Sequence, residues 1–258
     1  MKKFLALLLA FMLVFALVGC GDKNTDDDKK EDEQENENEV QVMSYDEYMA
    51  AELDSEVVVE TYVQAKQAWA EDKATLYTQD ENGAYFIYGM ACSEEDYEKL
   101  TVGTKIRVTG FKSEWAGEVE IIDATFEIIE GNYVAEALDV TSMLGAEDLI
   151  NHQNEFVSFK GMTIEASTDA EGNEAAFLYN WDGSGEEGTN CDLYFNASID
   201  GQTYTFTVES DLCDESSDVY KAVQALKVGD VVDMEGFLYW YEGVNPHITS
   251  VAVEAIAE

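Results

Sequence analysis

Basic residues, histidine and proline are all scarce in this sequence. It contains 14 Lys and Arg against 55 Asp and Glu, with two histidines and a single proline. A protein that binds nucleic acid neutralises phosphates with Lys or Arg and releases their counterions. The shortage of basic residues therefore argues against a nucleic-acid partner. A strongly acidic chain instead favours solubility and permits cationic partners or divalent ions.

Several motifs of well-known catalytic sites are also missing. The sequence has no GxSxG nucleophile elbow, no GxxxxGK[ST] phosphate loop and no HExxH zinc helix. His152 and His247 lie in different parts of the chain, and neither has a motif around it, so a structural or surface role is expected for both. We expect no enzyme, no catalytic residue and no cofactor. A hydrolase using scattered carboxylates remains an alternative, which two close, buried carboxylates in a deep cleft would favour.

Cysteine is sparse, and its spacing does not suggest a zinc site. Beyond Cys20 the chain has Cys92, Cys191 and Cys213, which is an odd number. Cys191 and Cys213 flank one expected hairpin and are the candidate disulfide pair, because an exported protein can keep such a bond. Cys92 is then expected to be a buried thiol.

The first twenty residues have the pattern of a secretory signal. Lys2 and Lys3 precede an unbroken apolar run over 4–18, which is too short to span a bilayer and ends at Gly19-Cys20. The cysteine at this position resembles the lipobox of bacterial lipoproteins. That resemblance implies that residues 1–19 are removed and that the Cys20 thiol carries a diacylglyceryl group, with palmitate as an attached acyl chain. The alternative is an ordinary signal peptide with a chance cysteine.

The segment after the signal is polar throughout. Residues 21–39 contain no apolar side chain to bury, so we expect residues 20–40 to form a lipidated, disordered tether. A cation-binding or adhesive tail is the alternative. Two acyl chains hold a protein well, so the expected location is the extracytoplasmic face of the cell membrane. No later segment is long and apolar enough to span a bilayer.

An internal repeat organises the remaining chain. Leu100-Thr-Val-Gly103 recurs as Leu226-Lys-Val-Gly229, and the match continues at the same offset of 126 to Gly236-Phe237. Upstream, residues 55–58 match 154–157 at an offset of 99, so the second copy carries 27 additional residues before its Leu-x-Val-Gly turn. Such a repeat predicts two domains. We place domain one at 44–132, and a linker helix with domain two at 133–258.

Each copy alternates apolar and polar residues and is rich in β-branched side chains, which favours strands. In copy one the expected strands are 57–65, 75–78, 84–90, 104–112 and 118–129. A short helix over 93–100 begins with Ser93 and Asp96, a capping pattern. In copy two the expected strands are 156–166, 175–181, 192–199, 203–209, 231–239 and 247–253, with a helix over 217–226. Short helical segments at 44–49 and 146–150 are expected to plug a barrel end or form the joint.

The order of three strands, a helix and two strands resembles the OB-fold, a five-stranded Greek-key barrel. The fold class expected is therefore all-β with short helices, as two tandem OB-like barrels. In layout the chain looks like uncharacterised OB-domain lipoproteins of Gram-positive bacteria. That resemblance implies an exported, anchored protein and does not imply a ligand.

Aromatic residues in the expected loops are the candidate ligand-binding residues. OB domains bind ligands on the face of strands two and three and between the loops joining strands one–two and four–five. Trp69 and Trp115 fall in those loops in copy one, and Trp181, Trp240 and Tyr241 fall in or near them in copy two. Their rings can stack on a sugar, a peptide side chain or a base. The alternative is that each tryptophan caps an open barrel end.

We therefore expect a surface binding module for an oligosaccharide, a peptide or a partner protein. Single-stranded nucleic-acid binding, the commonest OB role, is one alternative, and a spacer without a ligand is another. No metal is expected, because the acidic stretches at 80–83 and 182–188 lack the spacing of a calcium loop. Weak calcium binding at the 182–192 loop remains an alternative.

Overall fold

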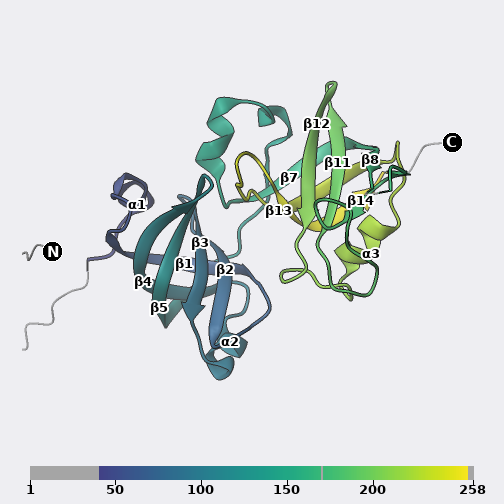
Figure 1. Ribbon diagram of the computed structural model, residues 1–258. Coiled ribbons are helices and arrows are strands. Elements are labelled where there is room, and N and C mark those ends of the chain that lie inside the picture. Colours follow the sequence, from purple (N-terminus) through teal and green to yellow (C-terminus); the bar gives the residue numbers. More distant parts are fainter. Residues whose placement is uncertain (1–40, 170, 255–258) are drawn as a thin grey trace, which may run out of the picture. The chain divides into compact units, whose positions relative to one another are not determined.

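Strands make up most of the chain in this computed structural model, which describes residues 41–169 and 171–254 (Figure 1). The predicted signal peptide, Cys20 and the tether lie outside the described residues. No helix in the described part is long and apolar enough to cross a membrane. The described residues belong to one compact unit, which contains two barrels.

Barrel one is a closed sheet in the order β1-β2-β3-β5-β4. Its strands are β1 (Glu56–Lys66), β2 (Lys73–Gln79), β3 (Ala84–Ala91), β4 (Thr104–Trp115) and β5 (Glu118–Asn132). β1 pairs with β4 to close the ring, and β3 runs parallel to β5. Figure 1 shows the short helix α2 (Glu94–Lys99) at one end of these strands. This order is that of an OB barrel, as predicted.

Barrel two repeats the same ring. Its strands are β7 (Phe156–Glu165), β11 (Leu193–Ile199), β12 (Gln202–Val208), β13 (Val231–Phe237) and β14 (His247–Val253), with α3 (Asp218–Gln224) between β12 and β13. β7 pairs with both β11 and β13, and β12 runs parallel to β14, so the sheet closes. The two-residue strands β6 (Leu138–Asp139) and β10 (Leu178–Tyr179) extend its edges. The predicted fold class is confirmed.

The prediction of a barrel strand at 175–181 is wrong. The chain between β7 and β11 holds only β8 (Ser167–Thr168), β9 (Glu174–Ala175) and β10, each of two residues. Asn180 lies in the left-handed backbone region, with φ of 61°, so β10 ends after two residues. The second barrel strand is therefore β11.

The register of the repeat differs by one residue from the sequence match. Asp54 and Asn154 both lie in the left-handed backbone region, with φ of 63° and 68°. Their N–H groups donate to the carbonyls of Lys112 and Leu238, at 2.8 and 2.9 Å. The first strands are thus 100 positions apart rather than 99, and the second copy has 26 additional residues. The sequence match had aligned Glu56 with Glu155, and this identity favoured the wrong register.

The two short segments ahead of the barrels both contribute to a barrel core. α1 (Tyr45–Ala50) begins with a capping box between Ser44 and Glu47 and buries Tyr48 in the core of barrel one. The second segment is a 3-10 helix, η2 (Glu147–His152), which buries Leu149 in the core of barrel two. Each segment therefore packs into its own barrel. Of the two predicted roles, plugging a barrel or forming the joint, the first is the one observed for both segments. A one-turn 3-10 helix, η1 (Thr141–Met143), precedes η2.

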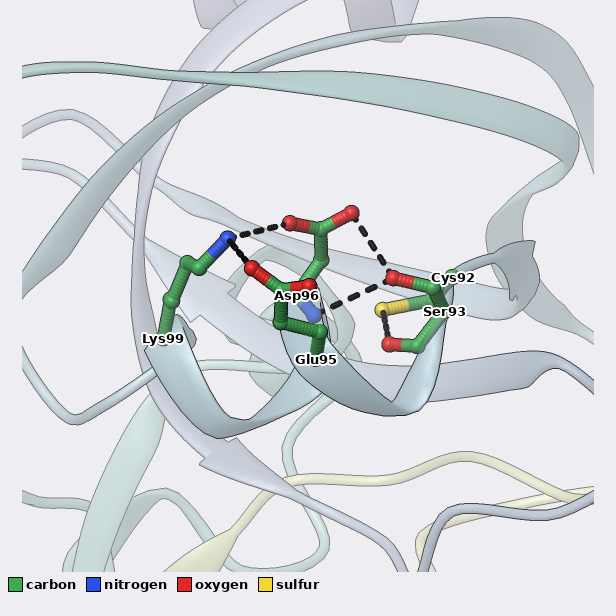
Figure 2. A network of polar contacts seen from close by, with 5 residues as sticks. All are labelled: Cys92, Ser93, Glu95, Asp96 and Lys99. Atoms are coloured by element: carbon green, nitrogen blue, oxygen red, sulfur yellow. Dashed lines mark hydrogen bonds and ion pairs between the residues drawn. The ribbon is translucent and has the colours of Figure 1, made fainter.

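The start of α2 shows how local sequence fixes a helix in this fold (Figure 2). Ser93 accepts the backbone N–H of Asp96 at 3.2 Å, and its hydroxyl lies 2.9 Å from the Asp96 carboxylate. Lys99 then pairs with Glu95 and Asp96 one turn on, at 3.1 and 2.9 Å. The predicted capping pattern is confirmed.

Candidate functional site: an open groove and a cavity between the barrels

Two of the candidate aromatics line one open groove on barrel two, which we call the barrel-two groove. Trp181, in the insertion, is 76% exposed, and Tyr241, in the loop between β13 and β14, is 49% exposed. Both line a hollow of about 580 Å3 with Asn196 of β11 and Thr205 of β12. The insertion (166–192, between β7 and β11) and the loop between β13 and β14 (238–246) thus place large rings over the face of β11 and β12, the second and third barrel strands.

The side chains that line the barrel-two groove are all uncharged. They are Ala166, Ser167, Thr168, Leu178, Trp181, Tyr194, Asn196, Thr205, Tyr241, Val244 and Asn245. The Asn196 amide is fixed in place, since its nitrogen donates to Ser167 at 3.1 Å and its oxygen accepts from Thr205 at 2.9 Å. The groove therefore offers exposed rings beside oriented amide and hydroxyl groups.

Trp69 and Trp240 have structural contacts instead. The Trp69 indole N–H donates to the Cys92 carbonyl at 2.9 Å, which ties the β1–β2 loop to the end of β3. The Trp240 backbone N–H donates to Glu118 at 2.9 Å, and its ring packs beside Gly117, where an added Cβ would lie 2.9 Å from it. Trp69 therefore braces barrel one, and Trp240 of barrel two contacts barrel one at the turn between β4 and β5.

The fifth candidate, Trp115, lies at a different place. It is 62% exposed and lines a cavity of about 450 Å3 between the barrels, which we call the interbarrel cavity. Barrel one supplies Gln67, Phe86, Tyr88, Trp115 and Glu120 to its walls, and barrel two supplies Glu209, Tyr239 and His247. The predicted aromatics are therefore divided between two sites and do not converge on one groove.

An aromatic cluster joins the barrels beside this cavity. Tyr77 of β2 stacks on Phe237 of β13 with ring centroids 4.4 Å apart, and Tyr239 stacks on His247 at the same distance. The Tyr77 hydroxyl lies 2.8 Å from His247 Nδ1. Because His247 is buried, its pKa falls to about 3 and the ring is neutral at physiological pH. His247 therefore has the structural role expected, within the interface.

The linker also holds the barrels together. Gln153 donates its amide N–H to the Gly117 carbonyl and accepts the Val119 N–H, both at 2.8 Å. The backbone of Glu242 donates to Ala116 at 2.7 Å, so the β4–β5 turn of barrel one contacts the β13–β14 loop of barrel two. These contacts fix the walls of the interbarrel cavity.

Three glutamates lie at this interface, two of them buried and Glu209 partly buried, and none was predicted as a site residue. Glu118 is fully buried, and desolvation raises its pKa to about 8. Glu120 lines the cavity, and burial raises its pKa as well. Burial is the main cause that raises the pKa of Glu209 to about 8, and the negative charges of Asp192 and Asp211 add to it. The only sequence signal was that Glu118 and Glu120 occupy alternate positions of a strand, on one face.

Glu118 is held at the contact between the barrels. Its Oε2 accepts the Trp240 N–H at 2.9 Å. This hydrogen bond and the Asn154 side chain both lower the pKa of Glu118, but desolvation by burial is the larger effect and leaves the pKa raised.

Two of these glutamates, Glu120 and Glu209, line the interbarrel cavity from opposite barrels. Burial is the first cause of the raised pKa of each. The absence of an enzymatic activity stays a prediction.

The predicted disulfide is not formed, since Cys191 and Cys213 are free thiols. Cys213 packs against the core of barrel two, where burial raises its pKa to about 11. Cys191 instead lies 2.8 Å from the Thr189 hydroxyl, within its own loop. The two cysteines therefore serve different contacts. Cys92 is a buried thiol, as predicted.

The acidic loops are organised around their own backbone. Asp182 accepts the N–H of Ser184 at 3.0 Å, and Asp192 accepts both the N–H and the hydroxyl of Ser210 at 2.8 Å. Across residues 41–169 and 171–254, no three His, Cys, Asp or Glu side chains gather to hold a metal ion. The loop glycines at 183, 185 and 188 have the GxGxxG spacing, but β11 follows them rather than a helix, so the dinucleotide-binding context is missing.

Most basic side chains of the described region are held by internal partners. Nine Lys and Arg lie in it, and seven of them contact a carboxylate or a backbone carbonyl. These seven are Lys66, Lys99, Lys105, Arg107, Lys112, Lys160 and Lys221. Few cations are therefore available to neutralise phosphates.

Among known proteins, only solved structures are similar to this chain. No protein-family model and no curated protein matches the chain. A structure described as the Ifi202 HINa domain in complex with 20bp dsDNA is 11% identical, with a TM-score of 0.34 over 78% of this chain and 98% of that one. The p204 HINb domain is 10% identical, with a TM-score of 0.35 over 80% and 100%.

A Replication Protein A heterotrimer bound to ssDNA is also similar. It is 9% identical, with a TM-score of 0.29 over 78% of this chain and 49% of that one. At such scores the similarity carries no inference about a ligand. The strand order and the two closed rings of the present structure define its OB barrels.

Proposed function

We propose that this protein is a non-catalytic binding module that takes a neutral carbohydrate in the barrel-two groove. The observation that carries the proposal is that Trp181 and Tyr241, two exposed rings, line one groove with uncharged amide and hydroxyl side chains. Exposed rings of this size in polar loops are not explained by core packing. The mouth of a β-barrel is also a common place for ligand sites.

The chemistry of the groove suits a sugar better than a charged ligand. A pyranose presents a flat C–H face, which can stack on an indole or a phenol, and a rim of hydroxyl groups. Asn196, Thr205 and Asn245 provide donors and acceptors at the groove wall for that rim. A charged ligand would find no counter-charge among the lining residues.

The location we propose is the extracytoplasmic face of a bacterial membrane, with the chain anchored through lipid on Cys20. The support is the sequence of residues 1–20, with its basic start, its short apolar run and a cysteine after Gly19. Metabolic labelling with an alkyne palmitate tests this. We expect label and membrane association in the wild type and neither in Cys20→Ser. Label retained in Cys20→Ser would contradict the anchor.

Nucleic-acid binding is the second candidate function, since OB barrels commonly bind single strands. The seven internally held basic side chains and the net charge of −41 oppose it. An oligonucleotide titration at low salt separates the two candidates. Tight, salt-sensitive binding would favour this second function.

The carbohydrate proposal is tested with the full-length protein on a glycan array, followed by calorimetry with the best oligosaccharide. We expect Trp181→Ala and Tyr241→Ala each to weaken binding about tenfold or more. Trp115→Ala is the matched control, because it removes an equally exposed ring from the other site. Unchanged binding in both groove variants would reject the groove.

A further inference from the structure

The interbarrel cavity differs in chemistry from the barrel-two groove. Aromatic rings and carboxyl groups line it together, with one carboxyl from each barrel, and no Lys or Arg is among the lining residues. We infer that this cavity is a second ligand site, which binds the ammonium group of an organic amine such as an alkylamine or a lysine side chain. This inference is independent of the carbohydrate proposal.

The aromatic walls are the first support. Phe86 is buried in the wall, whereas Tyr88 and Trp115 are 57% and 62% exposed at the cavity. The face of an aromatic ring attracts a cation through its quadrupole, and several rings around one point form the usual cage for alkylammonium groups. The alkyl chain of the ligand would lie against the same rings.

The carboxyl groups are the second support. Glu120 of β5 and Glu209, just after β12, line the cavity from opposite barrels, and Gln67 fixes Glu209 by donating to its Oε2 at 2.8 Å. An ammonium has three N–H donors and forms short, charge-assisted bonds to carboxylates. The site is thus complete only when both barrels are in place.

The volume and the overall charge agree with this ligand. About 450 Å3 is within the range of small-molecule pockets and accommodates an amine with a short alkyl chain. The formal charge of −41 raises the local concentration of cations around the protein and speeds their association.

Binding is expected to release protons, because the raised pKa of Glu209 favours its protonated form. Burial first, and then the charges of Asp192 and Asp211, raise this pKa to about 8. His247 Nδ1 lies 3.8 Å from Glu209 Oε2, but burial keeps that ring neutral. On the side of barrel one, Glu118 and Glu120 are also buried with raised pKa values. A bound cation stabilises the carboxylate forms and lowers these pKa values.

The remaining titratable groups at the cavity do not oppose this linkage. Burial keeps His247 neutral and raises the pKa of Tyr77 and Tyr239. Below pH 8 the ligand must therefore displace a proton from Glu209. The affinity should rise with pH towards 8 and level off above it.

The experiment is a calorimetric titration of the full-length protein with n-hexylamine, using hexan-1-ol as the uncharged control. We expect hexylammonium to bind, hexanol not to bind, and the heat to differ between phosphate and HEPES buffers because protons are released. Affinity for hexylammonium should be higher at pH 8 than at pH 6.

Three variants localise the site. Glu209→Gln and Glu120→Gln should each weaken binding tenfold or more and reduce proton release, while Trp115→Ala, an exposed position, should weaken it without affecting the fold. Trp181→Ala is the control and should leave amine binding unchanged. Equal binding of hexanol, no binding of hexylamine at 10 mM, or full binding by Glu209→Gln would overturn the inference.

Discussion

The two barrels share one ring of strands but differ in their loops. In barrel one, residues 67–72 join β1 to β2, and two residues, Ala116 and Gly117, join β4 to β5. In barrel two the same connections run over 166–192 and 238–246. The short loops of barrel one leave room for barrel two to pack against them. The long loops of barrel two form a groove of their own.

This difference suggests how one fold supports two kinds of site. The ring and its cores are repeated, while the loops carry the aromatic residues that distinguish the copies. Function in such folds is set by the site placed on the barrel rather than by the barrel itself. The comparison predicts that changes to the shared ring act alike in both barrels, and that changes to loops do not.

The largest effect is expected from a glycine that both rings share, Gly110 in β4 and Gly236 in β13. An added Cβ at Gly236 would lie 2.2 Å from the His247 carbonyl oxygen, and at Gly110 it would lie 2.7 Å from the Ile121 side chain. Gly236→Ala should lower the free energy of unfolding by about 3 kcal/mol or more, and Gly110→Ala by less. Chemical denaturation measures both. A Gly236→Ala protein of unchanged stability would contradict the close approach of β14 to this glycine.

A second effect concerns the pH dependence of the interface. The pKa of Glu118 is raised to about 8 in the folded state, so the folded chain holds a proton that the unfolded chain loses above pH 4.5. Stability from this group is complete below pH 4.5 and is lost as the pH rises through 8.

Glu118→Gln removes this ionisation and keeps a group of the same shape. At pH 8 it should therefore be more stable relative to the wild type than at pH 6, by about 2 kcal/mol. Glu98→Gln, at a site remote from the interface, is the control. Parallel stability curves for the wild type and Glu118→Gln would argue that Glu118 is ionised when folded.

His247 gives the opposite pH dependence. Its pKa falls from 6.5 to about 3 on folding, so the unfolded chain binds a proton that the folded chain does not. Stability should therefore fall as the pH drops from 6.5 towards 3. Thermal unfolding between pH 4 and pH 7 checks this, and His247→Gln should flatten the acid side of the curve.

A smaller effect is expected from the hydroxyl that meets His247. Tyr77→Phe keeps the stacking on Phe237 and removes the group 2.8 Å from His247 Nδ1. The loss should be about 1–2 kcal/mol, because the buried ring nitrogen loses its partner. Tyr204→Phe, a hydroxyl outside this interface, should change stability by less than about 0.5 kcal/mol. Equal losses of stability in the two variants would show that the contact between Tyr77 and His247 does not stabilise the interface.

Much of the fold followed from the sequence, because alternation and the repeat reinforce each other. The burial pattern of β1 alternates almost throughout, and strand limits in copy one were predicted within three residues. The insertion was harder, because Asn180 takes the left-handed backbone conformation and ends β10 after two residues, which the apolar residues of 175–181 do not indicate. The register error arose because a glutamate matches in the two copies when they are aligned at an offset of 99. The backbone hydrogen bonds that define the true register, at an offset of 100, cannot be seen in the sequence.

The candidate sites were predictable only in part. Tryptophans in loops indicated where exposed rings lie, and Trp181 and Tyr241 do share a groove. The interbarrel cavity needs residues such as Gln67, Glu120 and Glu209, which come together only when two domains dock. In a chain with 55 acidic residues, composition alone cannot single out these glutamates.

The central claim is that the aromatic residues form two separate sites, one on barrel two and one between the barrels. Fluorine NMR of the 5-fluorotryptophan protein tests it directly, because the chain has four tryptophans and Trp→Phe variants assign each signal. The oligosaccharide should shift the Trp181 signal alone, and hexylammonium should shift the Trp115 signal alone. Both ligands moving one and the same signal would contradict the account.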